Sequence, residues 1–145
     1  MKKSGFIFED HTADVQVRSW GRNLEEAFIQ TVYSLMTTIS PNLEKILPRV
    51  EKSITIRAED KEALLFDFLS EYLYIFDVEG LLFSEVVITS LEEIDNEYVL
   101  QATMKGEKFN KSTHEIGTEV KAITYSFMNI EESEKRVEIR IVFDI

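Results

Sequence analysis

The sequence predicts an α+β fold, a single two-layer domain of mostly antiparallel β-sheet with two main helices. Two segments place apolar residues at three- and four-residue steps, the period of amphipathic helices, and several others alternate apolar and polar residues as strands do. Strands follow one another after the second helix, which argues against a regular βαβα order. A length of 145 residues suits one domain that covers residues 1–145.

Composition and charge exclude several functions. Apolar residues make up 44% of the chain, enough for a core, and the absence of Cys excludes disulfides, thiolate chemistry and zinc sites built on thiolates. A net charge of −11 makes the chain a poor non-specific binder of nucleic acid, because neutralising phosphates needs clustered Lys and Arg. No long apolar run follows the basic start, so we expect no signal peptide, no membrane span and a cytoplasmic location.

The first part of the chain predicts a strand followed by a helix. Residues 6–19 are expected to be extended, because apolar and polar side chains alternate over residues 13–18. Asn23 is a good N-cap, and Glu26 three residues later completes a capping-box-like pair that starts the helix. Pro41 closes this helical segment.

The middle of the chain predicts a loop over residues 41–49, a strand over 52–58 and then the second helix. Asp60 can cap this helix, and Gly80 ends it. Its apolar stripe is expected to face the core.

The rest of the chain is expected to be mostly β. Asp95-Asn96 is a reasonable hairpin turn, and the charged run at residues 131–135 is a second turn. The strands that these turns connect are 81–92 with 97–107, and 119–130 with 136–145.

The alternation of side chains along the first and last predicted strands places an aspartate on the polar face of each. Asp14 lies on the polar face of the first strand, and Asp144 lies on the polar face of the last, next to Ile145 at the end of the sequence. If these strands pair, the two side chains meet beside the α-carboxylate of Ile145, and a hard cation would relieve their repulsion. Oxygen-only ligands suit calcium, magnesium or manganese better than zinc. The alternative is that both are ordinary exposed acids.

Two further groups of residues could carry chemistry. His11 and His114 are the two histidines and could change charge near neutral pH, or each could simply bond to loop backbone. The polar stretch 105–117 could be a functional loop or a solvated connection. A triad of Ser126 with His11 and Asp10 can be assembled on paper, but the spacing does not support it and no nucleophile-elbow motif is present. No catalytic residue is therefore predicted.

Four motifs in sequence resemble the archease family, over nearly the whole length and in the family's order. They are His11-Thr12-Ala13-Asp14 with Trp20-Gly21 and Leu24-Glu25-Glu26-Ala27-Phe28; Leu64-Leu65 with residues 69–77; Gly106-Glu107 and His114 with residues 119–125; and Val142-Phe143-Asp144-Ile145. One departure is visible: the family's late motif usually continues with His after Tyr, and here that position is Ser126.

The resemblance implies a small metal-binding protein that is not itself an enzyme. Archeases activate the tRNA-splicing RNA ligase that joins ends through a guanylylated histidine, promoting its guanylylation and multiple turnover. The family's metal residues carry over to Asp14, Asp144 and Ile145. Calcium would be the expected ion in crystals, with magnesium or manganese also possible, and the partner is the ligase protein.

Two other functional classes remain open at this point. One is a chaperone-like interaction module without a metal role, which an acidic α+β surface would also support. The other is a metal-dependent hydrolase, although the chain lacks an evident base and nucleophile set.

Overall fold

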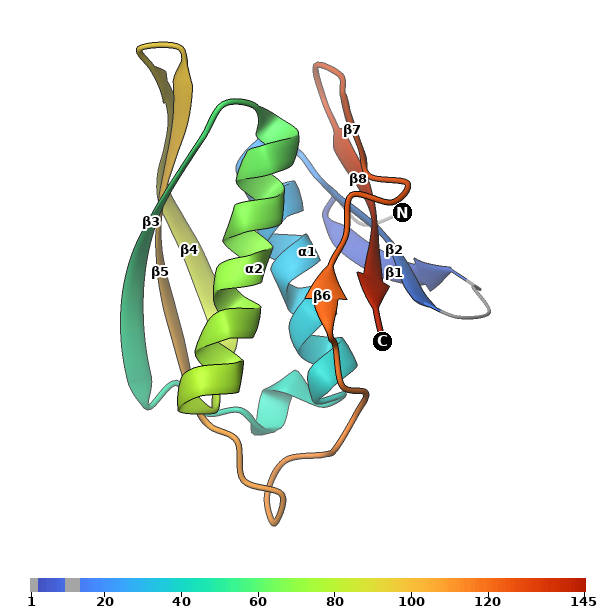
Figure 1. The fold of residues 1–145 in the computed structure, drawn as a ribbon, viewed down its shortest axis with the longest axis vertical. Helices are drawn as coiled ribbons and strands as arrows, with labels where there is room; N and C mark the ends of the chain where they lie inside the picture. Colours follow the sequence, from blue (N-terminus) through green and yellow to red (C-terminus); the bar gives the residue numbers. More distant parts are fainter. Residues whose placement is uncertain (1–2, 10–13) are drawn as a thin grey trace.

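The computed structural model describes residues 3–9 and 14–145 and confirms the predicted α+β class. Two helices lie between two antiparallel sheets, as Figure 1 shows. The helices are α1 (Leu24–Ile39) and α2 (Lys61–Glu79), with a short 3-10 helix, η1 (Leu43–Lys45). The strands are β1 (Gly5–Glu9), β2 (Asp14–Gly21), β3 (Val50–Ala58), β4 (Leu81–Ile94), β5 (Glu97–Lys108), β6 (Ala122–Ile123), β7 (Asn129–Glu132) and β8 (Val137–Asp144).

The first sheet joins the two ends of the chain. Its strand order is β1-β2-β8-β6, with β7 also pairing with β8, and the second sheet has the order β3-β5-β4. All of these pairings are antiparallel. The strand β2 thus lies beside the last strand, β8, which is the pairing that the carboxylate hypothesis required.

The predicted helix boundaries are confirmed with one change in detail. The Asn23 side chain accepts a hydrogen bond from the Glu26 N–H (2.9 Å), and the Asp60 side chain accepts one from the Ala63 N–H (2.7 Å). The Glu26 carboxylate accepts from the Arg22 N–H, one residue before the position that a capping box uses. Gly80 ends α2 in the left-handed conformation, with φ of 72°.

Two of the expected strands are divided. Residues 6–19 form β1 and β2, which pair antiparallel, and their link at residues 10–13 lies outside the described residues. Residues 119–130 form only β6 and β7, because a turn closed by the Met128 N–H and the Tyr125 carbonyl oxygen interrupts them. The hairpin turn at Asp95-Asn96 is confirmed, with positive φ at both residues.

The core lies where the helices meet both sheets. Phe28 of α1 stacks on Phe68 of α2, whose ring meets Tyr72 edge to face, and Tyr72 meets Phe83 of β4 in the same way. All four are fully buried, and so is Phe143 on β8. The apolar stripe of α2 therefore faces the core, as predicted. Within residues 3–9 and 14–145, no helix combines the length and apolar character that a membrane span requires.

The close approach of β4 to β5 at Gly106 yields a first prediction. A Cβ atom on Gly106 would lie 1.7 Å from the Leu82 carbonyl oxygen and 2.7 Å from the Phe83 Cα, so backbone would have to move. We expect Gly106→Ala to lower the free energy of unfolding by about 2 kcal/mol or more, as overpacked cores do. Denaturant titration measures this change.

The control for this substitution is Lys105→Ala, one residue away on the exposed side of the same strand. The Lys105 ammonium pairs with the Glu51 carboxylate only at 3.8 Å on the surface, so its loss should cost less than about 1 kcal/mol. Equal stabilities for the two variants would contradict the steric argument.

Candidate functional site

The pairing of β2 with β8 brings Asp14 and Asp144 together. The two strands run in register over eight residue pairs, and Asp14 is the partner of Asp144 at one end of the ladder. On the other side of Asp144 lies Ala122 of β6. Cross-strand partners hold their Cβ atoms about 5 Å apart on the same face. Two carboxylates therefore lie next to each other where β2 begins and β8 ends.

Strand alternation puts both carboxylates on the face of the sheet that points away from α1. Val17 and Ser19 of β2 are fully buried, and the Ser19 hydroxyl lies 2.6 Å from the Thr31 hydroxyl of α1. Even-numbered residues of β2, including Asp14, therefore face outward. The side chain of Ile145, by contrast, packs against the core.

A second like-charged pair lies on the same outer face. Arg18 and Arg140 are register partners four residues along the strands from the aspartates. The Glu9 carboxylate lies 3.3 Å from Arg140 and 3.7 Å from Arg18, and Glu138 lies within 4.0 Å of both. Like charges directly opposite each other destabilise a sheet, and here two carboxylates offset the repulsion between the arginines. The outer face therefore carries two pairs of like charges that are register partners.

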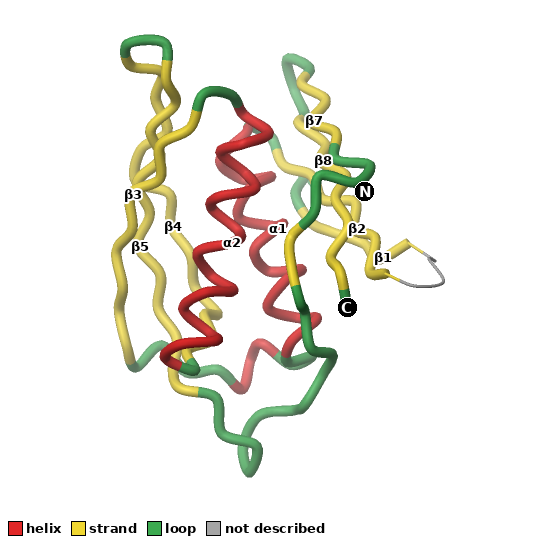
Figure 2. Tube along the Cα trace, in the orientation of Figure 1, coloured by secondary structure: helices red, strands yellow, loops and turns green. Residues whose placement is uncertain are grey.

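Asp14 also lines an open cavity of about 420 Å³ between the first sheet, α1 and a loop. The sheet contributes Phe8, Glu9 and Val15, α1 contributes Thr37 and Thr38, the segment after α1 contributes Pro41, and the loop contributes Gly117 and Thr118. The loop is residues 109–121, which Figure 2 shows running from β5 to β6 beneath the helices.

The loop 109–121 is bonded to both α1 and β8. The N–H groups of Gly117 and Thr118 donate to the carbonyl oxygens of Ile39 and Thr38, at 2.9 and 2.8 Å. These are carbonyls at the C-terminal end of α1, which have no partner within the helix. The Lys121 N–H donates to the Asp144 carbonyl oxygen at 2.7 Å. Residues 105–108 of the predicted polar stretch belong to β5, and residues 109–117 lie in this tethered loop beside the aspartates.

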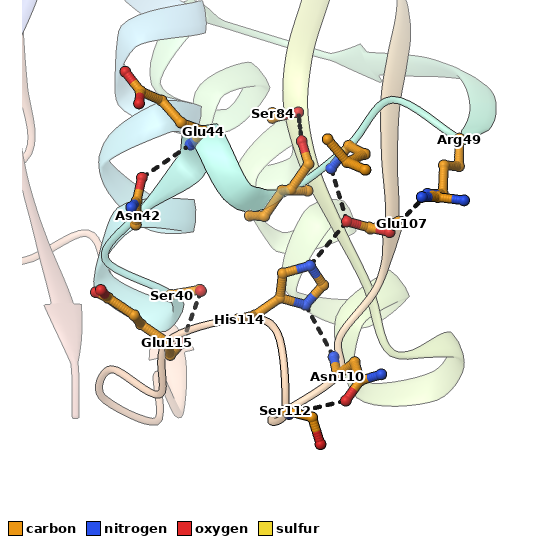
Figure 3. A network of polar contacts seen from close by, with 12 residues as sticks. Ser40, Asn42, Glu44, Arg49, Ser84, Glu107, Asn110, Ser112, His114 and Glu115 are labelled. Atoms are coloured by element: carbon orange, nitrogen blue, oxygen red, sulfur yellow. Dashed lines mark hydrogen bonds and ion pairs between the residues drawn. The ribbon is translucent and has the colours of Figure 1, made fainter.

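His114 anchors the other end of this loop, as Figure 3 shows. The Asn110 N–H donates to Nδ1 of His114 at 2.9 Å, so the ring proton lies on Nε2, which donates to Oε2 of Glu107 at 2.9 Å. The same Oε2 accepts from the Leu47 N–H at 2.8 Å, and Arg49 lies 3.3 Å from Oε1. The side chain of His114 is 1% exposed. His114 is therefore a structural residue that bonds to loop backbone and to Glu107.

The remaining candidates from the sequence are His11, Asp10 and Ser126. His11 and Asp10 lie outside the described residues, so the predictions that involve them stay predictions. Ser126 lies in the turn after β6, where its N–H donates to the Thr124 hydroxyl. Within the described residues, no three side chains of His, Cys, Asp or Glu cluster as a metal site. The predicted metal set has two side chains, and its third member is the α-carboxylate of Ile145.

Sequence reasoning missed the role of Glu107 in this arrangement. Glu107 accepts a hydrogen bond from the N–H of Leu47, which lies 60 residues earlier in the chain. No local sequence pattern connects the two residues. The hydrogen bond from the Leu47 N–H lowers the pKa of Glu107, and burial raises it. The hydrogen bond from His114 and the nearby charge of Arg49 lower the pKa further.

A lowered pKa predicts how the stability contributed by Glu107 varies with pH. Ionised Glu107 stabilises the folded protein fully above about pH 4.5, the ordinary pKa of glutamate. This stabilisation is lost as the pH falls through the lower pKa that Glu107 has in the folded protein. We expect Glu107→Gln to lower the free energy of unfolding at pH 7 by about 1–2 kcal/mol, since hydrogen bonds to charged groups are lost. Denaturant titrations between pH 7 and pH 3 should show this deficit shrinking below about pH 4.5. A deficit that stays constant with pH, or one shared by exposed Glu93→Gln, would count against the assignment.

Comparison with known proteins finds one family over most of the chain. A sequence profile of the Archease protein family matches residues 6–145. The archease of Pyrococcus furiosus is 44% identical over 122 residues, which cover 84% of each chain. The archease-like protein of Dictyostelium discoideum is 36% identical, over 97% of this chain and 93% of its own.

Solved structures agree with this result. The solution structure of protein 1598 from Methanobacterium thermoautotrophicum superposes with a TM-score of 0.85 at 32% identity, covering 97% of this chain and 99% of its own. A Thermotoga maritima protein described as an archease and possible chaperone shares the fold, with a TM-score of 0.60 at 22% identity over 94% of each chain. The family match and the curated relatives together show that this chain belongs to the archease family.

Proposed function

We propose that this protein binds a divalent cation and activates a tRNA-splicing RNA ligase, promoting guanylylation and multiple turnover of that enzyme without being a catalyst itself. Asp14, Asp144 and the α-carboxylate of Ile145 are the proposed ligands, and a cytoplasmic location is expected. Membership of the archease family supports the choice of partner and reaction. The pairing of Asp14 with Asp144 is the observation that carries the choice of site.

The available ligand atoms fit a hard cation. Two side-chain carboxylates on neighbouring strands and a main-chain carboxylate offer only oxygen, which suits calcium, magnesium or manganese. Asp144 has strand partners on both sides, so its backbone position is fixed before a cation binds. Calcium tolerates irregular oxygen sets better than magnesium does, and manganese is a further candidate.

A ligase that transfers a nucleotide to its own histidine needs charge neutralisation and correct placement of phosphate and nucleophile. When bound, a divalent cation where β2 begins and β8 ends would supply positive charge on an otherwise acidic surface. The chain's own contribution is a rigid acidic surface that docks beside the ligase and favours its competent arrangement. Phosphates of RNA are repelled by a chain of net charge −11, so the contact is with protein.

The alternative function is a chaperone-like interaction module without a metal role. The Thermotoga maritima relative is described as a possible chaperone, and an acidic surface also fits that activity. Calorimetry with calcium, magnesium and manganese separates the two functions. An interaction module without a metal role shows no specific heat of binding that depends on Asp14 and Asp144.

The proposal predicts a separation of function from stability in Asp14→Asn and Asp144→Asn. Each variant should lose cation binding and stimulation of the cognate ligase. In chelator, each should be as stable as the original chain or more stable, because one of several repelling charges is gone. The measurements are calorimetric titration, a ligase guanylylation assay and a thermal melt. Exposed Glu93→Gln is the charge-matched control and should change none of them. A large loss of stability in chelator would mean that the aspartates are structural.

Adding residues after Ile145 tests the role of its α-carboxylate. Residues added after Ile145 convert this carboxylate into a neutral peptide group, so the site loses one formal negative charge. We expect cation affinity to fall roughly tenfold or more, about 1.4 kcal/mol, and ligase stimulation to fall with it. The same residues added before Met1 should be tolerated. Equal affinity and stimulation in both extended forms would remove the α-carboxylate from the site.

A further inference from the structure

The turn between β6 and β7 exposes aromatic side chains that neither the core nor the carboxylate pair uses. Phe127 is 72% exposed and Tyr125 is 54% exposed. The ring of Tyr125 stacks on Phe66 of α2, with centroids 4.3 Å apart and planes 1° from parallel. Phe66, Tyr125 and Phe127 are called the aromatic surface below. In Figure 1 the segment that carries the turn runs along α2 before it enters β7.

The backbone of Phe127 has a conformation that bulky residues rarely adopt. The Met128 N–H donates to the Tyr125 carbonyl oxygen at 3.1 Å, which closes a four-residue turn with Phe127 in its third position. Its φ is 56°, in the left-handed region where Gly and Asn fit and a bulky side chain is an outlier. Strain of this kind is retained where surrounding structure enforces it and is frequent at functional positions.

Two carboxylates lie close enough to Tyr125 to act on its phenol. Burial against the neighbouring residues raises the pKa of the Tyr125 phenol, and the negative charges of Asp67 and then Asp60 raise it further. Both acids are exposed. The neighbouring ammonium of Lys61 pairs with Glu132, so its charge is already offset. The surface therefore combines an apolar centre with an acidic rim.

The aromatic surface also lies close to the carboxylate pair along the chain. Ala122 is the register partner of Asp144, and Tyr125 follows it by three residues. Three extended residues span at most about 11 Å. A partner seated on the aromatic surface would therefore lie near Asp144.

We propose that the aromatic surface, rimmed by Asp60 and Asp67, is where this protein docks onto a basic face of its RNA ligase partner. The inference rests on the proposed function and adds the contact surface to it. An enzyme that binds RNA carries clustered Lys and Arg, and guanidinium and ammonium groups bind aromatic faces and carboxylates. Exposed aromatic side chains often dominate the binding energy of protein interfaces. RNA itself is disfavoured as the occupant because the rim repels phosphate.

The test is Phe127→Asn, which removes the ring and suits the left-handed backbone. We expect a melting temperature equal to or above that of the original chain, together with at least tenfold weaker binding of the purified cognate ligase in a fluorescence titration. Binding by the original chain should weaken as salt is raised, because the rim attracts charge. Val87→Ala is the control, since Val87 is 58% exposed on β4 in the other sheet, and it should bind normally.

Each other outcome overturns the inference in a different way. If Phe127→Asn binds and stimulates the ligase as the original chain does, the docking surface is wrong and the proposed function stands. If the original chain neither binds nor stimulates the ligase, both are wrong. If the original chain binds single-stranded RNA and Phe127→Asn does not, the surface binds RNA. If Phe127→Asn abolishes self-association, the surface binds a second copy of the chain. Either result would overturn docking to the ligase.

Discussion

The antiparallel pairing of β2 with β8 is the contact on which the rest of the structure depends. It joins the start of the chain to its end and completes the inner face that packs on α1. Because side chains alternate across a strand, the register that buries Val17 and Phe143 also puts Asp14 opposite Asp144 on the outer face. A slip of one residue would expose the core and separate the aspartates. The contacts that stabilise the fold therefore also hold the two aspartates opposite each other.

The loop 109–121 extends this constraint to the rest of the molecule. One end is held by His114 against Glu107, its middle bonds the last carbonyls of α1, and its end bonds the backbone of Asp144. Gly117 is required at the crossing with α1, because a Cβ atom there would lie 2.3 Å from the Thr38 carbonyl oxygen. The carboxylate pair is thus supported by long-range hydrogen bonds as well as by its own two strands.

Local chemistry in the sequence was enough to predict the helices, the Asp95-Asn96 hairpin and the phase of the last strand. Asn23, Asp60 and Gly80 have the side chains that cap and end helices, so each signal lies within a few residues of its effect. The proximity of Asp14 and Asp144 followed from the alternation of side chains along their strands, once the two strands were assumed to pair. That assumption concerned residues 130 positions apart, and the resemblance to archeases pointed to the same residues.

Sequence reasoning failed where a long-range contact or an unusual turn decides the structure. The turn at residues 125–128 carries Phe at the position that favours Gly or Asn, so it gave no signal and the region was read as one strand. Glu107 receives its hydrogen bonds from Leu47 and His114, and the contact with Leu47 has no local signature. Residues 6–19 were likewise predicted as one extended segment, whereas they form two strands, β1 and β2, that pair with each other.

We propose that Asp14 and Asp144 hold one cation between the paired strands β2 and β8. An amide NMR titration with manganese tests it most directly, because a bound paramagnetic ion broadens the signals nearest to it. A cation at this position should broaden the signals of Asp14, Lys121, Ala122 and Asp144 first, and leave the Asp95-Asn96 turn unaffected until much higher concentrations. Uniform broadening over the acidic surface, or broadening centred elsewhere, would contradict it.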